Sequence, residues 1–236
     1  MVAAFLRDGG DLFDVGANFG LVTFGVLPHV CGKGVGFHMF EANPRIVPLL
    51  ARSAHLWLAE KIAINHCCVT DQPGISMLNM PDSCWGHAFI GDHGDAVPNL
   101  VLDDYIAGSG VERIAFMKMD IEGWELHALK GAERSLLAGK VRAGFIEISP
   151  EALRRAGADA EGLLKFLQEV GFDVYFCGMW DSPDPHGLRW TRLSINGTSL
   201  RFAQGSPLPP SYVAGDVLVV HHSSPHHAVL REAMAG

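Results

Sequence analysis

The stretch "LFDVGANFGLVTF", Leu12 to Phe24, decides the fold of this chain. An apolar run leads into Asp14, and glycines follow at Gly16 and Gly20. Glycine at such a place permits a tight turn and lets a ligand approach the backbone. The free N–H groups at the start of a helix favour polar ligand groups. We therefore predict a buried strand, a ligand-binding loop and a helix in this order.

The alternation of strand and helix continues along the chain. Further strands are predicted within residues 32–44, 61–71, 113–120, 142–149, 173–180 and 216–222, and further helices within residues 44–59, 123–139 and 160–171. The segment 72–99 is expected to be irregular, and 99–110 to be a connection. This order is typical of a doubly wound α/β fold, in which helices cover both faces of a parallel sheet. Ligands bind at the carboxyl ends of such strands.

Composition and charge exclude several classes of protein. The formal net charge is -8 and no Lys/Arg cluster occurs, so we expect no nucleic-acid partner, because phosphate neutralisation requires a basic surface. No apolar run approaches the roughly 20 residues of a membrane span, and a signal-peptide pattern is absent. Five cysteines without a CxxC pair argue against a disulfide framework and against a structural zinc site. A cytoplasmic protein with reduced cysteines is therefore expected.

Two carboxylates indicate which ligand the loop binds. A dinucleotide loop reads G-x-G-x-x-G, but here Asn18 replaces the second glycine and Gly20 comes one residue early. Asp14 would repel a pyrophosphate and attract an α-ammonium group. Glu41, at the end of the second predicted strand, can accept both hydroxyls of a ribose. S-adenosylmethionine carries both an amino-acid end and a ribose; the alternative is that the glycines shape a tight turn without a ligand.

Several motifs resemble those of one known family. "DVGANFG", "FEANP", "VLDDYI", "KMDIEGWELHALKGAE" and "FIEIS" are similar to motifs of FkbM-type methyltransferases, which are class I S-adenosylmethionine-dependent enzymes. The most specific pattern is K-x-D-x-E-G-x-E-x-x-x-L-K-G-A, from Lys118 to Ala132. The resemblance covers about residues 9–175. It implies a seven-stranded, mostly parallel, doubly wound Rossmann-like sheet with helices on both faces and an antiparallel last strand.

The resemblance also implies which residues contact the cofactor. The main candidates are Asp14, Gly16, Asn18, Gly20 and Glu41, and a weaker one is Asn43. In this architecture the end of the third strand lies beside the adenine. We predict adenine contacts for His66 and Cys68, with a buried strand of small side chains as the alternative.

The chemistry of methyl transfer to an alcohol requires a group that accepts the hydroxyl proton. Asp120, the last residue of the fourth predicted strand, is the first candidate for base or substrate positioning, and His87 and His93 are alternatives. No metal ligands are assigned, although a divalent ion holding the acceptor oxygens is a competing mechanism. A buried lone lysine is costly, so we predict that Lys118 pairs with Glu147 of the neighbouring strand.

The expected function is O-methylation of a small hydroxylated molecule, a sugar or a secondary metabolite, as in natural product biosynthesis. The alternatives are methylation of nitrogen or of a macromolecule, a nicotinamide-dependent oxidoreductase, and a binding module without catalysis. A small-molecule acceptor is the expected partner, and a homodimer is left open.

The length suits one domain, residues 1–236. We expect residues 1–175 to form the cofactor-binding core and residues 176–236 to add C-terminal strands and loops to the acceptor site. The segment 179–213 has no assigned role, and the chain has little sequence before its first strand. We interpret the histidines of the tail "VLVVHHSSPHH" as scattered surface residues rather than a metal site.

Overall fold

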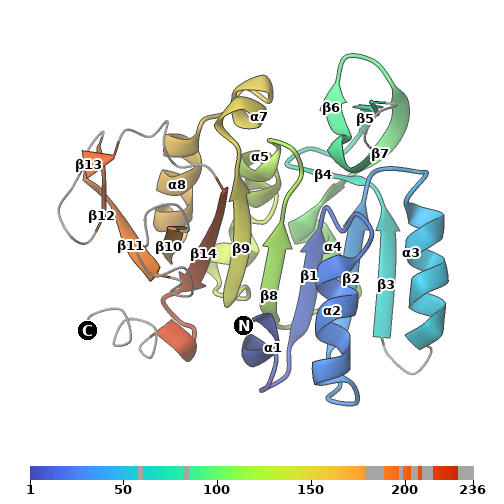
Figure 1. The fold of residues 1–236 in the computed structure, drawn as a ribbon, viewed down its shortest axis with the longest axis horizontal. Helices are drawn as coiled ribbons and strands as arrows, with labels where there is room; N and C mark the ends of the chain where they lie inside the picture. Colours follow the sequence, from blue (N-terminus) through green and yellow to red (C-terminus); the bar gives the residue numbers. More distant parts are fainter. Residues whose placement is uncertain are drawn as a thin grey trace.

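The computed structural model describes residues 1–57, 61–81, 85–178, 189–196, 199–202, 207–208 and 215–227 (Figure 1). The strands are β1 (Asp11–Val15), β2 (Gly36–Glu41), β3 (Lys61–His66), β4 (Cys68–Thr70), β5 (Ile75–Asn79), β6 (Phe89–Gly91), β7 (Asp95–Val101), β8 (Ile114–Met119), β9 (Ala143–Ile148), β10 (Phe172–Gly178), β11 (Arg189–Asn196), β12 (Ser199–Phe202), β13 (Pro207–Leu208) and β14 (Gly215–His221). The helices are α1 (Val2–Phe5), α2 (Leu21–Val30), α3 (Val47–Ala54), α4 (Leu102–Ser109), α5 (Glu125–Lys130), α6 (Glu133–Leu137), α7 (Pro150–Arg155) and α8 (Ala160–Glu169), with 3-10 turns η1 (His55–Trp57) and η2 (Trp85–His87).

A large sheet with the order β13-β12-β11-β10-β14-β9-β8-β1-β2-β3 forms the centre of the fold. Strands β3, β2, β1, β8 and β9 pair in parallel, whereas β14 is antiparallel to both β9 and β10. The predicted α/β sheet of seven strands with an antiparallel last strand is therefore confirmed. Strands β11 to β13 extend it beyond β10 by antiparallel pairing.

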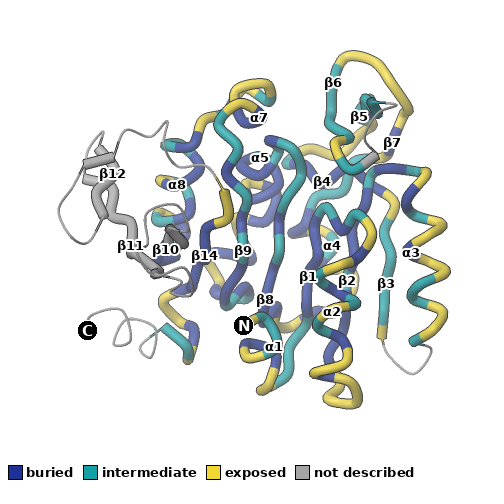
Figure 2. The backbone as a smooth tube through the Cα atoms, viewed as in Figure 1, coloured by how far each residue is buried: buried dark blue, intermediate teal, exposed yellow. Residues whose placement is uncertain are grey.

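The sheet is buried because helices cover both of its faces (Figures 1 and 2). Neighbouring residues of a strand point to opposite faces: Phe13 packs into the core that includes α4, α5, α6 and α8, whereas Leu12 packs into the core of α1 and α2. Helix α3 adds Leu50 to a smaller core around Met39 of β2. None of the helices in the described ranges is both long and apolar enough to cross a membrane.

The third predicted strand is wrong in its extent. The chain follows β2 as far as His66 and then leaves the large sheet at Cys67, whose N–H donates to the carbonyl of Glu41 at 3.1 Å. The following strand, β4, pairs with β7 in a separate sheet of order β4-β7-β5-β6. Residues 72–99, expected to be irregular, supply β5, β6 and most of β7. Their polar, glycine-containing sequence does not indicate a sheet, because this sheet depends on the pairing of β7 with β4, about thirty residues earlier in the chain.

The helix predicted over residues 123–139 is two helices, α5 and α6, that meet at Gly131. A Cβ atom on Gly131 would lie 2.4 Å from the carbonyl oxygen of Thr70, so this helix must approach β4 closely. The connection predicted over residues 99–110 is the end of β7 followed by α4. From α4, the buried Asp103 carboxylate accepts the N–H groups of Arg134 and Ser135, each at 2.9 Å. Asp103 therefore fixes the first turn of α6.

Replacing Asp103 by Ala is expected to lower the free energy of unfolding by about 2 kcal/mol, because two N–H groups of α6 lose a charged acceptor. Urea denaturation measures the change. The control is Asp104→Ala, which removes a 73% exposed carboxylate that pairs with the exposed guanidinium of Arg134 at 3.0 Å and should cost below about 1 kcal/mol. Equal effects of the two substitutions would contradict this role of Asp103.

Candidate active site

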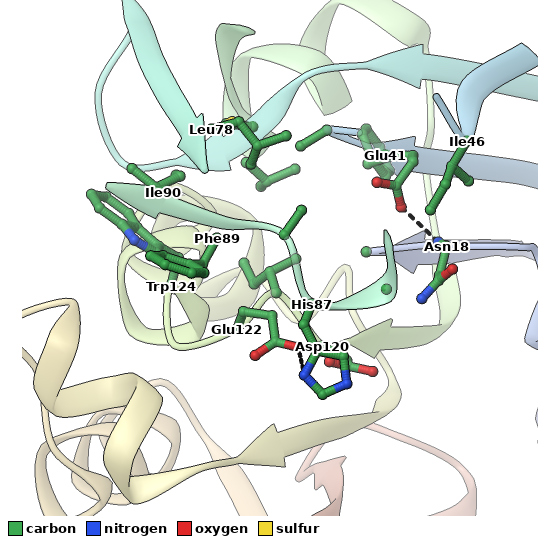
Figure 3. Close-up of a pocket in the computed structure, with 18 of the residues that line it drawn as sticks. Asn18, Glu41, Ile46, Leu78, His87, Phe89, Ile90, Asp120, Glu122 and Trp124 are labelled. Atoms are coloured by element: carbon green, nitrogen blue, oxygen red, sulfur yellow. Dashed lines mark hydrogen bonds and ion pairs between the residues drawn. The ribbon is translucent and has the colours of Figure 1, made fainter. Parts of the chain in front are cut away.

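A cavity of about 700 Å³ lies where the parallel strands end (Figure 3). The loop after β1, the end of β2, the turn after β8 and the end of β9 contribute residues to its lining. Glu41 and Asn18 lie at one end in Figure 3, whereas Asp120, Glu122 and His87 form a polar group elsewhere on its wall. This is the edge at which the sequence predicted ligand binding.

The glycine loop requires Gly16. This residue has a φ of +73°, and a Cβ atom there would lie 1.8 Å from the carbonyl oxygen of Asp120. The N–H groups of Gly16 and Ala17 both donate to the carbonyl of Phe40 at 3.0 Å. The loop is therefore held between the ends of β2 and β8, and a side chain at Gly16 would force these strand ends apart.

Glu41 is aligned by backbone donors on both sides. Its Oε2 atom accepts the N–H of Asn18 at 2.6 Å, and its Oε1 atom accepts the N–H of Asn43 at 2.7 Å. Asn18 reaches this position with a left-handed φ of +49°. Burial raises the pKa of the Glu41 carboxyl, and the two N–H donors oppose that rise. Each oxygen keeps capacity to accept a further hydrogen bond from a ligand hydroxyl.

Asp14 lies beneath the loop and is only 1% exposed. Its Oδ2 atom accepts the Thr23 hydroxyl at 2.7 Å and the Thr23 N–H at 3.2 Å. Burial raises the pKa of Asp14 to about 6 against the attraction of Lys118. Asp14 is not part of the cavity lining, although its place in the sequence predicted a contact with the ligand.

The predicted Lys118–Glu147 pair is wrong. The Lys118 ammonium donates to the Gly16 carbonyl at 2.5 Å and lies 3.4 Å from Asp120 Oδ2 and 4.0 Å from Asp14 Oδ1. The reason is the register of β8 and β9, which places Lys118 opposite Phe145 and Met119 opposite Ile146. Lys118 thus leans toward the glycine loop.

The same register brings Asp120 beside Glu147. Burial raises the pKa of the Glu147 carboxyl to about 8, and the charge of Asp120 and a side-chain hydrogen bond with it add to the rise. Asp216 follows on β14, opposite Glu147, and its pKa is raised by burial and by Asp120. The strand ends therefore carry a row of carboxyl groups in which Glu147 is held protonated near neutral pH.

The turn after Asp120 is shaped by Glu125. Its Oε1 atom accepts the N–H groups of Ile121 at 2.9 Å and Gly123 at 3.2 Å. Between them Glu122 adopts a left-handed φ of +56° and lies 4.0 Å from Nδ1 of His87. Burial raises the pKa of Glu122, and His87 opposes the rise. The "KMDIEGWE" motif is thus a turn that aims carboxylates into the cavity.

One wall of the cavity is apolar. It includes Leu78 of β5, Phe89 and Ile90 of β6, and Trp124. The guanidinium of Arg155 lies 4.1 Å from the centre of the Phe89 ring. The small sheet therefore covers the large sheet's ligand edge.

Two cysteines lie in the cavity lining between these groups. Burial raises the pKa values of the Cys67 and Cys68 thiols to about 12, so both remain protonated and serve as small apolar side chains. His66 instead turns away and bonds through Nε2 to the Ala42 carbonyl at 3.1 Å.

Six residues proposed from the sequence line the cavity together: Gly16, Asn18, Glu41, Cys68, His87 and Asp120. Five others lie outside its lining within the described part of the chain: Asp14, Gly20, Asn43, His66 and His93. Gly20 is the N-cap of α2, and His93 bonds through Nε2 to Asn79 at 2.7 Å. Of the segment 179–213, to which no role was assigned, residues 179–188, 197–198, 203–206 and 209–213 lie outside the described residues.

Several lining residues were missed as site residues: Cys67, Leu78, Phe89, Ile90, Trp124 and Glu147. The sequence did not indicate that Leu78, Phe89 and Ile90 line a site, because the sheet that contains β5 and β6 was not predicted. Trp124 and Glu147 could have been found from the sequence, since they belong to the motifs "DIEGWE" and "FIEIS" that carry the resemblance.

The profile described as the methyltransferase FkbM domain matches residues 14–174, more than half of the chain. The chain belongs to the FkbM methyltransferase family. The resemblance found in the sequence motifs is thus confirmed, and the glycine loop, Glu41 and the turn after Asp120 all lie inside the matched region.

Two curated relatives of this FkbM-family chain are similar along part of their length. The 31-O-demethyl-FK506 methyltransferase FkbM of Streptomyces tacrolimicus is 28% identical, over 54% of this chain and 61% of that protein. The hexuronic acid methyltransferase AglP of Haloferax volcanii is 26% identical, over 67% of this chain and 62% of that protein. The chain spans about three fifths of the length of these relatives.

Among solved structures, the methyltransferase FkbM of Methylobacillus flagellatus KT is similar to this chain with a TM-score of 0.52. The sequences are 19% identical, and the match covers 91% of this chain and 44% of that one. At this identity the likeness supports the fold.

The protonated state of Glu147 predicts how stability depends on pH. Between the ordinary Glu value of 4.5 and about 8, the folded chain holds a proton that the unfolded chain releases, so this group's contribution falls as pH rises through that window. Glu147→Gln removes the titration. Its stability relative to the original chain should therefore rise by on the order of 1–2 kcal/mol between about pH 5 and pH 8, after discounting for partial exposure.

Urea denaturation of both proteins at the two pH values measures this difference. Because the variant and the original chain are compared at the same pH, the contributions of other titrating groups to the stability difference cancel to first order. A stability difference that is the same at both pH values would contradict the raised pKa of Glu147.

Proposed function

We propose that this protein is an S-adenosylmethionine-dependent methyltransferase that methylates a hydroxyl oxygen of a small molecule, such as a sugar or a secondary metabolite. One observation carries the proposal: a single cavity joins a backbone-aligned carboxylate, Glu41, to the carboxyl pair Asp120 and Glu147. The first end suits the cofactor, and the second suits the removal of a proton. Membership of the FkbM family supports the same assignment.

The residues at the cofactor end fit S-adenosylmethionine. Asn18 lines the cavity, and its Oδ1 atom is buried and has no hydrogen-bond partner among the described residues. Such an acceptor suits an ammonium group, since a buried polar atom without a partner is costly. Both oxygens of Glu41 can accept ribose hydroxyls in addition to their N–H donors. Cys67, Cys68 and the apolar wall then offer a surface for the adenine.

S-adenosylmethionine supplies, when bound, a methyl group for an in-line displacement. The chain must orient the acceptor oxygen and accept its proton. We assign the proton acceptor to Asp120, whose carboxylate is positioned by the Lys118 ammonium at 3.4 Å and by the hydrogen bond with Glu147. His87, with a 71% exposed side chain 4.0 Å from Glu122, is the alternative proton acceptor.

The charge of the acceptor end favours a neutral acceptor. Asp120, Glu122 and the protonated Glu147 line it, and the ionised carboxylates among them attract hydroxyl donors and repel anions. The Haloferax relative is named for a hexuronic acid and the Streptomyces relative for 31-O-demethyl-FK506. We therefore propose an uncharged hydroxylated acceptor rather than an acidic sugar.

Asp120→Asn is expected to lower turnover at least about 100-fold, because an amide cannot accept the hydroxyl proton. Its affinity for S-adenosylmethionine should stay within about threefold, since Glu41 and the glycine loop are unchanged. Release of S-adenosylhomocysteine, with an acceptor found among neutral glycosides and hydroxylated metabolites, measures turnover. Near-normal turnover of this variant would exclude Asp120 as the base and favour His87.

Glu41→Ala should weaken binding of S-adenosylmethionine by about 1.5–3 kcal/mol, or roughly 10- to 100-fold, because the ribose hydroxyls lose a charged acceptor. Calorimetry measures the affinity, and circular dichroism checks that the variant is folded. The matched control is Glu151→Ala on the exposed side of α7, which should bind normally. A folded Glu41→Ala protein with unchanged affinity would remove Glu41 from the cofactor site.

Other expectations remain predictions. They are the single domain with a core of residues 1–175 and an acceptor-site contribution from residues 176–236, the cytoplasmic location, a homodimer and the absence of a catalytic metal. Activity that persists after exhaustive chelation would test the last of these.

A further inference from the structure

A second cluster of polar side chains lies at the other edge of the sheet. Because β14 is antiparallel to both β9 and β10, β10 runs parallel to β9 and begins at the edge opposite to the cavity. Asp173, near its start, meets His222 and His227 from the segment after β14. We call these three residues the Asp-His-His cluster.

The three side chains converge on one point. His222 Nε2 lies 3.4 Å from Asp173 Oδ1, and His227 Nε2 lies 2.7 Å from Asp173 Oδ2. One ligand atom from each residue lies within 4.8 Å of the other two. The two imidazole rings are 5.2 Å apart between centroids and meet at 72°. Each carboxylate oxygen thus faces a different imidazole nitrogen.

The cluster is built on fixed backbone. Asp173 is 4% exposed and pairs with Val220 in the β10–β14 ladder, and its Oδ2 atom also accepts the Tyr175 hydroxyl at 3.4 Å. The His222 N–H donates to the Gly171 carbonyl at 2.9 Å. A buried carboxylate with an oriented second partner and two converging imidazoles is the arrangement that a metal ligand set needs.

We propose that the Asp-His-His cluster binds a zinc ion that fastens the segment 222–227 to the start of β10. Two imidazole nitrogens and one carboxylate oxygen suit Zn²⁺, with a water molecule as fourth ligand. With bonds of about 2.0–2.1 Å, the ligand atoms of a tetrahedral zinc site lie roughly 3.4 Å apart. The distance from His222 Nε2 to Asp173 Oδ1 matches this spacing at 3.4 Å, whereas the 2.7 Å contact of His227 Nε2 with Asp173 Oδ2 must lengthen when the ion binds. His222, with a 55% exposed side chain, leaves one side open to solvent.

The position indicates a structural role. His226, in the same segment, packs its ring on Phe5 of α1 with centroids 4.8 Å apart. An ion held by Asp173, His222 and His227 would therefore join the end of the described chain to both β10 and the first helix. The sequence suggested surface histidines because Asp173 lies 49 residues before His222, so only the fold brings them together.

The test uses the full chain without a polyhistidine tag, stripped of metal by chelation and titrated with zinc chloride alone. Calorimetry should give one equivalent with a dissociation constant on the order of 1 μM or lower. Zinc at a hundredfold excess over that constant should raise the melting temperature by about 5 °C. Neither readout depends on methyl transfer.

Two variants and a control decide which residues bind. His222→Ala changes an exposed side chain and should weaken zinc binding at least about tenfold, as should His227→Ala. The control, His226→Ala, removes a histidine of the same segment and should bind zinc normally. Absence of one-equivalent binding in the original chain, full affinity in folded His222→Ala, or an equal loss in His226→Ala would each overturn the proposal.

Discussion

The ammonium group of Lys118 holds the ligand edge of this protein together. It donates to the carbonyl of Gly16 and lies close to the carboxylates of Asp120 and Asp14. Burying a charge without partners is costly, and here each partner belongs to a different part of the site: the loop, the strand that precedes the turn, and the residue beneath the loop. Lys118 therefore couples the glycine loop to Asp120, the carboxylate that we assign to the chemistry.

The backbone geometry around Lys118 positions the glycine loop, the turn after Asp120 and the pair of Asp120 and Glu147. The loop passes so close to the carbonyl of Asp120 that only glycine fits at position 16, and the turn after Asp120 is closed by the carboxylate of Glu125. The β8–β9 register then sets Asp120 beside Glu147. The end that we propose for the cofactor and the end that we propose for proton transfer thus lie at the same edge of the sheet, at the ends of β2 and of β8 and β9. The small sheet covers this edge.

The sequence predicted those parts that depend on local pattern. The order of strands and helices, the loop at Gly16 and the positions of Glu41 and Asp120 at strand ends follow from apolar periodicity and glycine chemistry. The predicted pairing of Lys118 with Glu147 was wrong, because the register between two strands cannot be determined from the sequence of either strand alone. The small sheet was missed because β4 pairs with residues about thirty positions later along the chain. The apolar wall of the cavity was missed for the same reason. Asp173 and His222 are likewise joined only by the folded chain.

We propose that one cavity holds S-adenosylmethionine with its ribose on Glu41 and its reacting end toward Asp120. A crystal structure of the complex with S-adenosylhomocysteine tests this most directly. We expect ribose hydroxyls within hydrogen-bond distance of Glu41, the amino-acid end beside Asn18, and the sulfur facing Asp120 and Glu147. Binding of the molecule elsewhere, or with its ribose away from Glu41, would contradict it.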